Sequence, residues 1–165
     1  KEASNVLVEN NEIIYCAIGV GSDLSPFEPG GTIEFRNNRF AYNGMAMSFN
    51  SETGGNRIVG NVFEGNLTQV GYGAHSEAAA KNHWQGNYWD DYQGFDRDGD
   101  GFGDRPHELL AYADQIWMEM PVARFFRDSP VMELLDFLER LAPFSSPARV
   151  LQDDRPRFSR ERQSS

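Results

Sequence analysis

The first ninety residues repeat one pattern of apolar and polar positions four times. In each repeat a large apolar residue stands three positions before an asparagine, and another stands two positions after it. The asparagines are Asn11, Asn38, Asn61 and Asn87, separated by 23 to 27 residues. The apolar residues form two matching columns: Val8, Phe35, Ile58 and Trp84 before the asparagines, and Ile13, Phe40, Phe63 and Trp89 after them. Self-similarity at such a period indicates stacked structural units.

Within each repeat apolar residues alternate with polar ones, which predicts short β-strands. The spacing leaves no room for a crossover helix. We therefore expect an all-β fold, a right-handed parallel β-helix over residues 1–95 that continues a longer solenoid preceding Lys1. Asparagines at its corners can stack as a ladder, because their amides bond above and below and tolerate the left-handed backbone of a tight bend. An antiparallel sandwich would explain the turns but not the aligned columns.

After Pro106 the apolar period lengthens towards 3.6, which predicts a C-terminal α-helical appendix over residues 109–144. Its clearest helix has Ser129 as a cap and Pro130 in the first turn. One face of this helix carries an apolar stripe, made up of Val131, Leu134, Leu135, Leu138 and Leu141. The stripe could cover the open end of the β-helix, or dock on another protein or at a membrane surface. Residues 145–165 are rich in Pro, Arg and Ser, which is typical of a flexible polar tail.

An aspartate-rich loop over residues 96–108 lies between the repeats and the predicted helices. Its carboxylates, with the carbonyl of Phe102, occupy the alternating positions of a calcium loop, and Gly101 stands where such a loop turns sharply. These carboxylates belong to Asp96, Asp98, Asp100 and Asp104. The usual closing glutamate is replaced by His107. Hard oxygen ligands favour Ca²⁺, or Mg²⁺, and the position at the end of the coils favours a structural role. The alternative is a solvated acidic turn.

A second set of candidate ligands is soft. Thioethers select Cu(I), and residues two apart on a strand face the same side, so Met45 and Met47 could share one ion. His75 lies one coil further along, and His83 follows on the other side of the same loop. The alternative is that the methionines fill the core and the histidines are ordinary surface residues.

The bulk composition narrows the function. The formal net charge is −10, which argues against nucleic acid as a partner. No apolar run is long enough to span a bilayer, no export signal stands at Lys1, and Cys16 is the only cysteine. Asp90 and Asp91 are adjacent, so on a strand they would face opposite sides and would not form the paired carboxylates of a glycosidase. No serine–histidine–aspartate arrangement or phosphate loop is present.

Two blocks in this order, GNYWDDYQGFDRDGDGFGDRPHEL and SPVMELLDFLERLAPF, resemble the C-terminal part of the NosD family, the periplasmic maturation proteins of nitrous oxide reductase. The resemblance implies a β-helix of the carbohydrate-binding and sugar-hydrolase type without hydrolytic activity of its own. It also implies a periplasmic location and a role in assembling the copper-sulfide centre of the reductase. The partners it implies are an ABC transporter with ATPase and permease subunits, and a copper chaperone. A carbohydrate-binding or polysaccharide-processing β-helix is the alternative.

Overall fold

The computed structural model describes residues 3–23, 26–50, 54–72, 80–111 and 148–160. Their strands form three sheets, and each of the first three coils gives one strand to each sheet. The six-stranded sheet contains, in spatial order, β1 (Val6–Glu9), β4 (Ile33–Arg36), β7 (Arg57–Val59), β10 (His83–Gln85), β13 (Ala148–Asp153) and β12 (His107–Ala111). The four-stranded sheet contains β2 (Glu12–Ile14), β5 (Arg39–Ala41), β8 (Val62–Glu64) and β11 (Tyr88–Trp89). The three-stranded sheet contains β3 (Ile18–Ser22), β6 (Met45–Phe49) and β9 (Thr68–Tyr72).

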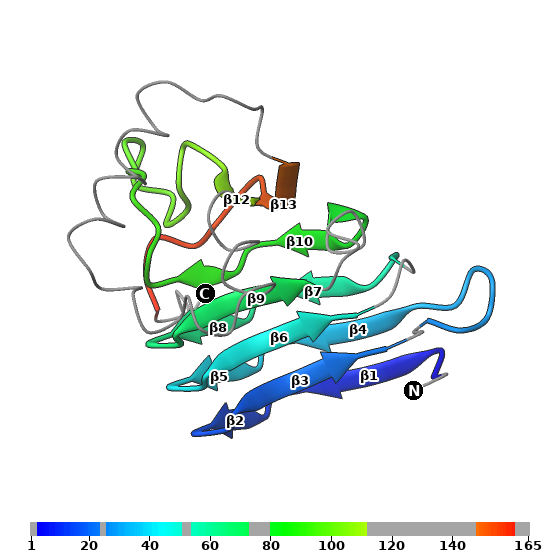
Figure 1. Ribbon diagram of the computed structural model, residues 1–165. Helices are drawn as coiled ribbons and strands as arrows, with labels where there is room; N and C mark the ends of the chain where they lie inside the picture. Colours follow the sequence, from blue (N-terminus) through cyan, green and yellow to red (C-terminus); the bar gives the residue numbers. More distant parts are fainter. Residues whose placement is uncertain (1–2, 24–25, 51–53, 73–79, 112–147, 161–165) are drawn as a thin grey trace.

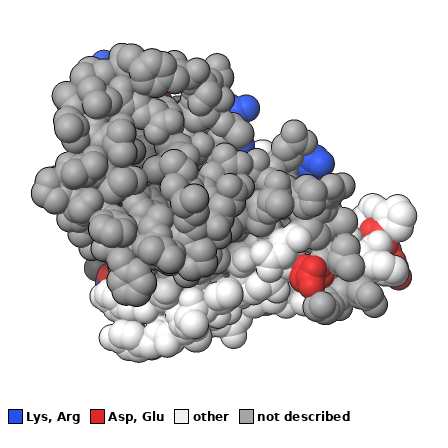
Figure 2. Space-filling model, in the orientation of Figure 1, with Lys and Arg blue, Asp and Glu red and all other residues white. Residues whose placement is uncertain are grey.

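The coils stack in parallel, as the sequence predicted for a parallel β-helix, and Figure 1 shows them rising from β1, β2 and β3 to β10. The first predicted column is present in the register, where Val8 pairs with Phe35, and Phe35 pairs with Ile58. Each coil thus places its apolar residues directly over those of the coil before it. In the view of Figure 2, the lower coils around β3 and β6 present mainly side chains that are neither acidic nor basic.

Aromatic rings fill the upper half of the core. Phe40, Phe63 and Trp89 stack face to face, with ring centroids 5.2 Å and 4.3 Å apart, and none is more than 1 % exposed. Trp84 meets Phe63 and Trp89 at tilted angles. Large rings bury much apolar area, and their stacking adds roughly 0.5–1.5 kcal/mol per pair. The two predicted apolar columns therefore form one continuous core.

Two corners of each coil turn through a residue with positive φ followed by a polar ladder residue. At the first corner the turning residues are Asn10, Asn37, Gly60 and Gly86. At the second corner they are Tyr15, Tyr42 and Gly65. The sequence pattern predicts this conformation for the ladder asparagines themselves, but the left-handed residue is the one before each of them. The ladder side chain is thereby left free to bond along the stack.

The first ladder runs through the whole described stack. Asn11 donates to Asn38, Asn38 to Asn61 and Asn61 to Asn87, through backbone and side-chain N–H groups at 2.9–3.1 Å. Each side-chain amide also bonds a backbone carbonyl, as Asn61 does with Phe35 at 2.9 Å. Asn38, Asn61 and Asn87 are at most 1 % exposed, so nearly every polar atom that the corner buries is paired within the stack.

The chain returns to close the upper end of the coils. β13 inserts between β10 and β12, pairing in parallel with β10 and antiparallel with β12. The carboxylate of Asp153 ends the first ladder, accepting the side-chain and backbone N–H groups of Asn87 at 2.9 Å and the Trp89 indole N–H at 3.2 Å. The guanidinium of Arg157 donates to the carbonyls of Gly86 and Gly60 at 3.0 Å. The top of the stack is thus fixed by residues close to the end of the sequence.

The C-terminal half differs from the sequence prediction. Residues 109–111 belong to β12 and are not helical, because they pair along β13. β13 lies in the segment predicted to be a flexible polar tail, where Val150 and Leu151 are at most 1 % exposed. The described part of the chain shows no C-terminal helical appendix, and residues 112–147, with the predicted apolar stripe, lie outside it. No helix among the described residues is long and apolar enough to cross a membrane.

Candidate metal-binding sites

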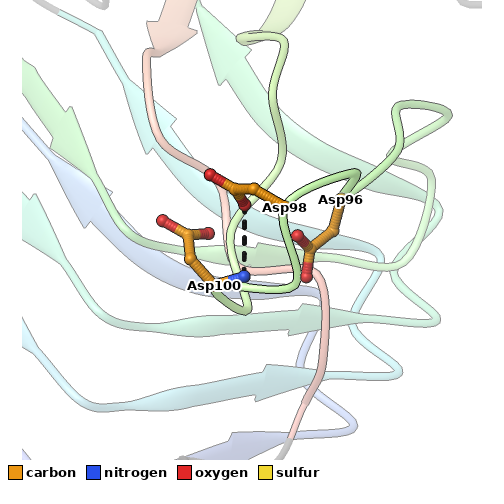
Figure 3. A group of neighbouring side chains, drawn as sticks. All are labelled: Asp96, Asp98 and Asp100. Carbon is orange, nitrogen blue, oxygen red and sulfur yellow. Dashed lines mark hydrogen bonds between the residues drawn. The ribbon is translucent and has the colours of Figure 1, made fainter.

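The aspartate loop brings three of its predicted ligands together. Asp96, Asp98 and Asp100 each offer a carboxylate oxygen, and these oxygens lie within 4.8 Å of one another. Figure 3 shows them on one tight loop, where Asp98 accepts the backbone N–H of Asp100 at 3.2 Å. Gly101 has φ +84°, as expected for the sharp turn of a calcium loop. The oxygen-only donor set fits a hard cation such as Ca²⁺ or Mg²⁺.

Backbone amides and one arginine compensate the negative charge of the loop carboxylates. Asp96 accepts the amides of Gly99 at 2.7 Å and Gly101 at 2.9 Å. Arg155 donates to Asp100 at 2.7 Å, and its guanidinium lies 4.1 Å from the centre of the Phe102 ring. The hydrogen bond from Arg155, with a second from the Phe102 amide, lowers the pKa of Asp100. A cation in this loop would therefore compete with Arg155 for one carboxylate.

Of the two remaining predicted loop ligands, Asp104 is engaged elsewhere. The carboxylate of Asp104 accepts the backbone N–H of Arg97 at 2.9 Å and is not part of the three-carboxylate group. Phe102 donates its amide to Asp100 at 2.8 Å, and its backbone pairs with Arg157. The carboxylate group that the structure assembles is therefore smaller by Asp104 than the set predicted from sequence.

The predicted copper ligands are not assembled in the described residues. Met47 is fully buried in the core on β6, between Val20 and Val70 of the neighbouring coils. Met45 is half-buried, and its sulfur packs against Gly71 of β9. His83 is exposed on β10, in a different sheet, with its Nε2 3.2 Å from the Gln85 side-chain oxygen. His75 lies outside the described residues.

A pair that the sequence analysis did not connect lies where β11 ends. His107 Nε2 is 3.7 Å from Asp91 Oδ1. The His107 ring stacks on Trp89 with centroids 4.7 Å apart, and the Tyr92 ring meets its edge at 6.1 Å. The sequence alone predicts only that His107 lies beside the aspartate loop. Its position in β12, and hence its contact with Asp91, follows from the pairing of β12 with β13, which no local pattern announced.

Asp90 and Asp91 both border one hollow. The prediction that they would face opposite sides assumed a strand, and it does not hold here. β11 ends at Trp89, so both residues lie in the turn beyond it. The hollow has a volume of about 420 Å³ and is also lined by Gln69 and Leu109. Gln69 donates its side-chain amide to Asp90 at 2.5 Å.

Burial shapes the protonation of the pair. Burial is the main cause that lowers the pKa of His107, while the negative charge of Asp91 opposes that shift. Asp91 is half-exposed, yet the protein surrounding it raises the pKa of its carboxyl, against the opposing effect of His107. Both shifts disfavour the doubly charged pair.

Comparisons with known proteins place the coils in a family. The model of the family described as "Periplasmic copper-binding protein (NosD)" matches residues 1–94. The chain is 39 % identical over 106 residues to a protein of Pseudomonas aeruginosa named "Probable ABC transporter binding protein NosD", covering 64 % of this chain and 25 % of that protein. It is 36 % identical over 126 residues to the protein of the same name from Stutzerimonas stutzeri, covering 76 % of this chain and 28 % of that protein.

The chain thus spans about a quarter of the length of these relatives. The family match covers all the parallel coils up to β11, together with both asparagine corners. Since this match extends over more than half of the sequence, the chain belongs to the NosD family of periplasmic copper-binding proteins.

Proposed function

We propose that this protein acts in the periplasm as an accessory factor that supports assembly of the copper-sulfide centre of nitrous oxide reductase, together with an ABC transporter. The observation that carries the proposal is the family match over the coils, residues 1–94. The names of the two relatives support the association with an ABC transporter. The ATPase and permease subunits, the reductase and a copper chaperone are the partners we propose.

The role proposed is binding and delivery, without bond breaking. Stacked coils give a rigid, elongated scaffold, on which loops and the closed end can present binding groups to partners. The NosD family description concerns copper binding and names no reaction. We propose that copper is held transiently, and that the apolar stripe from Val131 to Leu141 docks on the permease.

We further propose that the aspartate loop holds a structural Ca²⁺ or Mg²⁺. The close approach of three carboxylates supports this, because their mutual repulsion is relieved by a cation. The loop also contacts the returning C-terminal segment, since Gly103 donates to the carbonyl of Pro156 at 2.8 Å and Phe158 donates to that of Gly101 at 2.9 Å. A cation there would fasten the closed end of the stack.

A carbohydrate-binding function is the second candidate, favoured by one observation. Tyr15 and Tyr42 are exposed and stacked, with centroids 5.6 Å apart and ring planes 18° from parallel. Sugars bind on open aromatic faces, but the far side of the Tyr42 ring lies against Gly65. Both faces of the Tyr42 ring are therefore used within the molecule, and Tyr15, which is 77 % exposed, offers the open aromatic face.

The experiment that tests the proposal removes this region from the full-length protein in a denitrifying cell. Reductase exported without its copper-sulfide centre, seen as loss of that centre's visible absorption and of copper content, is the expected result. Fully loaded reductase would contradict the proposal. Isothermal titration of the 165-residue chain with oligosaccharides tests the second candidate, and binding abolished by Tyr15→Ala would favour it.

A further inference from the structure

We propose that His107 and Asp91, with Asp90 beside them, form a binding site for a divalent transition-metal ion, Cu²⁺ or Zn²⁺, at the upper end of the coils. The inference rests on the proposed function only in naming copper as the ion of interest. The site is distinct from the aspartate loop, whose ligands are oxygens alone, and from the methionines of β6.

The first observation is an unpartnered nitrogen. His107 is 8 % exposed, and its Nε2 is buried without a hydrogen-bond partner. Leaving a buried polar atom unpaired costs about 1–3 kcal/mol, so such an atom in a folded protein indicates a missing ligand, ion or water. The imidazole nitrogen is the commonest protein ligand for transition metals.

The second observation is the distance to Asp91. At 3.7 Å, Nε2 and Oδ1 are too far apart for a good hydrogen bond. Two ligands that each lie about 2.0–2.2 Å from one ion are separated by roughly 3–4 Å. The observed gap therefore has the width that a shared metal ion requires.

The third observation is that the imidazole is fixed in place. Trp89 covers one face of the ring at 4.7 Å, and Tyr92 closes its edge at 6.1 Å. The strand that carries His107 is held by β13, where His107 pairs with Asp153. A ligand oriented in this way loses little conformational entropy when it binds an ion.

Access and charge complete the site. Asp91 is half-exposed and borders the hollow of about 420 Å³, which gives an ion a route from solvent. The adjacent Asp90 adds a second negative charge at the rim. An imidazole with carboxylates suits Cu²⁺ or Zn²⁺, whereas Cu(I) prefers thioethers. Few protein ligands leave coordination positions open, as expected for an ion that is passed on.

The test is a competition titration of the 165-residue chain with Cu²⁺ and Zn²⁺ salts, followed by electron paramagnetic resonance of the Cu²⁺ form. We expect one ion per chain and nitrogen hyperfine splitting from one imidazole. His107→Gln should weaken binding at least tenfold and remove the splitting. Asp91→Asn, at a half-exposed position, should weaken binding about tenfold. The matched control His83→Gln changes an exposed histidine of another strand and should leave both readouts unchanged.

A measurement on the unmodified chain covers the case in which His107→Gln does not fold. With histidine labelled by ¹⁵N, substoichiometric Cu²⁺ should broaden the imidazole signals of His107 before those of His83. Broadening of His83 first, or equal Cu²⁺ affinity in folded His107→Gln, would overturn the site and leave the proposed function standing. Absence of Cu²⁺ and Zn²⁺ binding by the unmodified chain would overturn it too. The proposed function itself fails only if reductase matures without this region in cells.

Discussion

The two corners of the coils use the same chemistry but end differently. At the first corner the ladder runs from Asn11 to Asn87 and is closed by the carboxylate of Asp153, which is fully buried. At the second corner the ladder begins with the amide of Cys16, which donates to Asn43 at 2.9 Å, and ends at Asn66. Asn66 is half-buried and donates to Gln69 at 3.0 Å, on the edge of the hollow.

This difference teaches what ends a ladder. An asparagine within the stack accepts from the coil below through its oxygen and donates through its amide. The residue that ends the ladder needs only to accept N–H groups from the coil below, and an ionised carboxylate is a pure acceptor. Asp153 takes five N–H groups: those of Gly86, Arg155 and Trp89 and both from Asn87. At the second corner the last asparagine reaches a carboxylate only indirectly, because Asn66 donates to Gln69, and Asp90 accepts the Gln69 side-chain amide and the backbone N–H of Gly65. That corner ends beside Asp91 and His107.

The largest effect should come from breaking the closed ladder in its middle. Asn61→Ala removes the acceptor for both N–H groups of Asn38 and the donor to Phe35, at a fully buried position. We expect the free energy of unfolding to fall by about 3 kcal/mol or more. At the second corner, Asn66→Ala leaves both N–H groups of the buried Asn43 without their acceptor. Asn66 itself is half-buried, so water can replace its side chain, and we expect a smaller loss of about 1–2 kcal/mol. Urea denaturation of both variants measures the difference, and equal losses would contradict it.

The next largest effect should come from changing Asp153, the carboxylate that ends the first ladder. Asp153→Asn places an N–H₂ group where only donors converge, so at least one buried donor loses its acceptor. We expect unfolding to become easier by about 2 kcal/mol. Asp154→Asn is the matched control, because Asp154 is exposed and next in sequence. If Asp153→Asn were as stable as the control in urea, the ladder would not depend on an acceptor-only end.

The repeated coils could be predicted from the sequence, but the pairing of β12 and β13 at the upper end of the stack could not. The coils could be predicted because Asn38, Asn61 and their apolar neighbours recur at a fixed period, and the period alone sets the register. Asp153 could not be placed, because it substitutes for a ladder asparagine in a segment about 66 residues beyond Asn87 with no repeat around it.

Candidate metal sites followed the same division. Asp96, Asp98 and Asp100 were foreseen as a group because their spacing in one loop determines their geometry. The sequence pattern predicts a ligand role for Met47. In the described residues Met47 is fully buried in the core, where an ion has no access to it. His107 and Asp91 meet only because β12 pairs with β13. Contacts made by tertiary pairing of this kind leave no local signal in a single sequence.

A smaller effect concerns the loop at the closed end. If the aspartate loop holds Ca²⁺, about 10 mM Ca²⁺ should stabilise the chain by roughly 1–3 kcal/mol, for a site of millimolar or somewhat tighter affinity. Asp98→Asn should abolish the Ca²⁺-dependent rise in Tm. Arg155→Ala should strengthen Ca²⁺ binding, because Asp100 then has no competing guanidinium. Calorimetric scans with and without chelator test both variants, and a rise that survives Asp98→Asn would refute the site.

The smallest effect concerns the protonation of His107, next to the end of the second corner, measured with chelator present. Burial lowers the pKa of His107 below its ordinary value of about 6.5, and the charge of Asp91 opposes that shift. Asp91→Asn should therefore lower the pKa of His107 further, as followed by the imidazole proton shifts in an NMR titration. A lowered pKa means that the unfolded chain binds the proton first. Stability is then lost as pH falls from 6.5 towards the folded pKa, more steeply in Asp91→Asn than in the exposed control Glu108→Gln. A His107 pKa that rises in Asp91→Asn would show that Asp91 does not act on the ring through its charge.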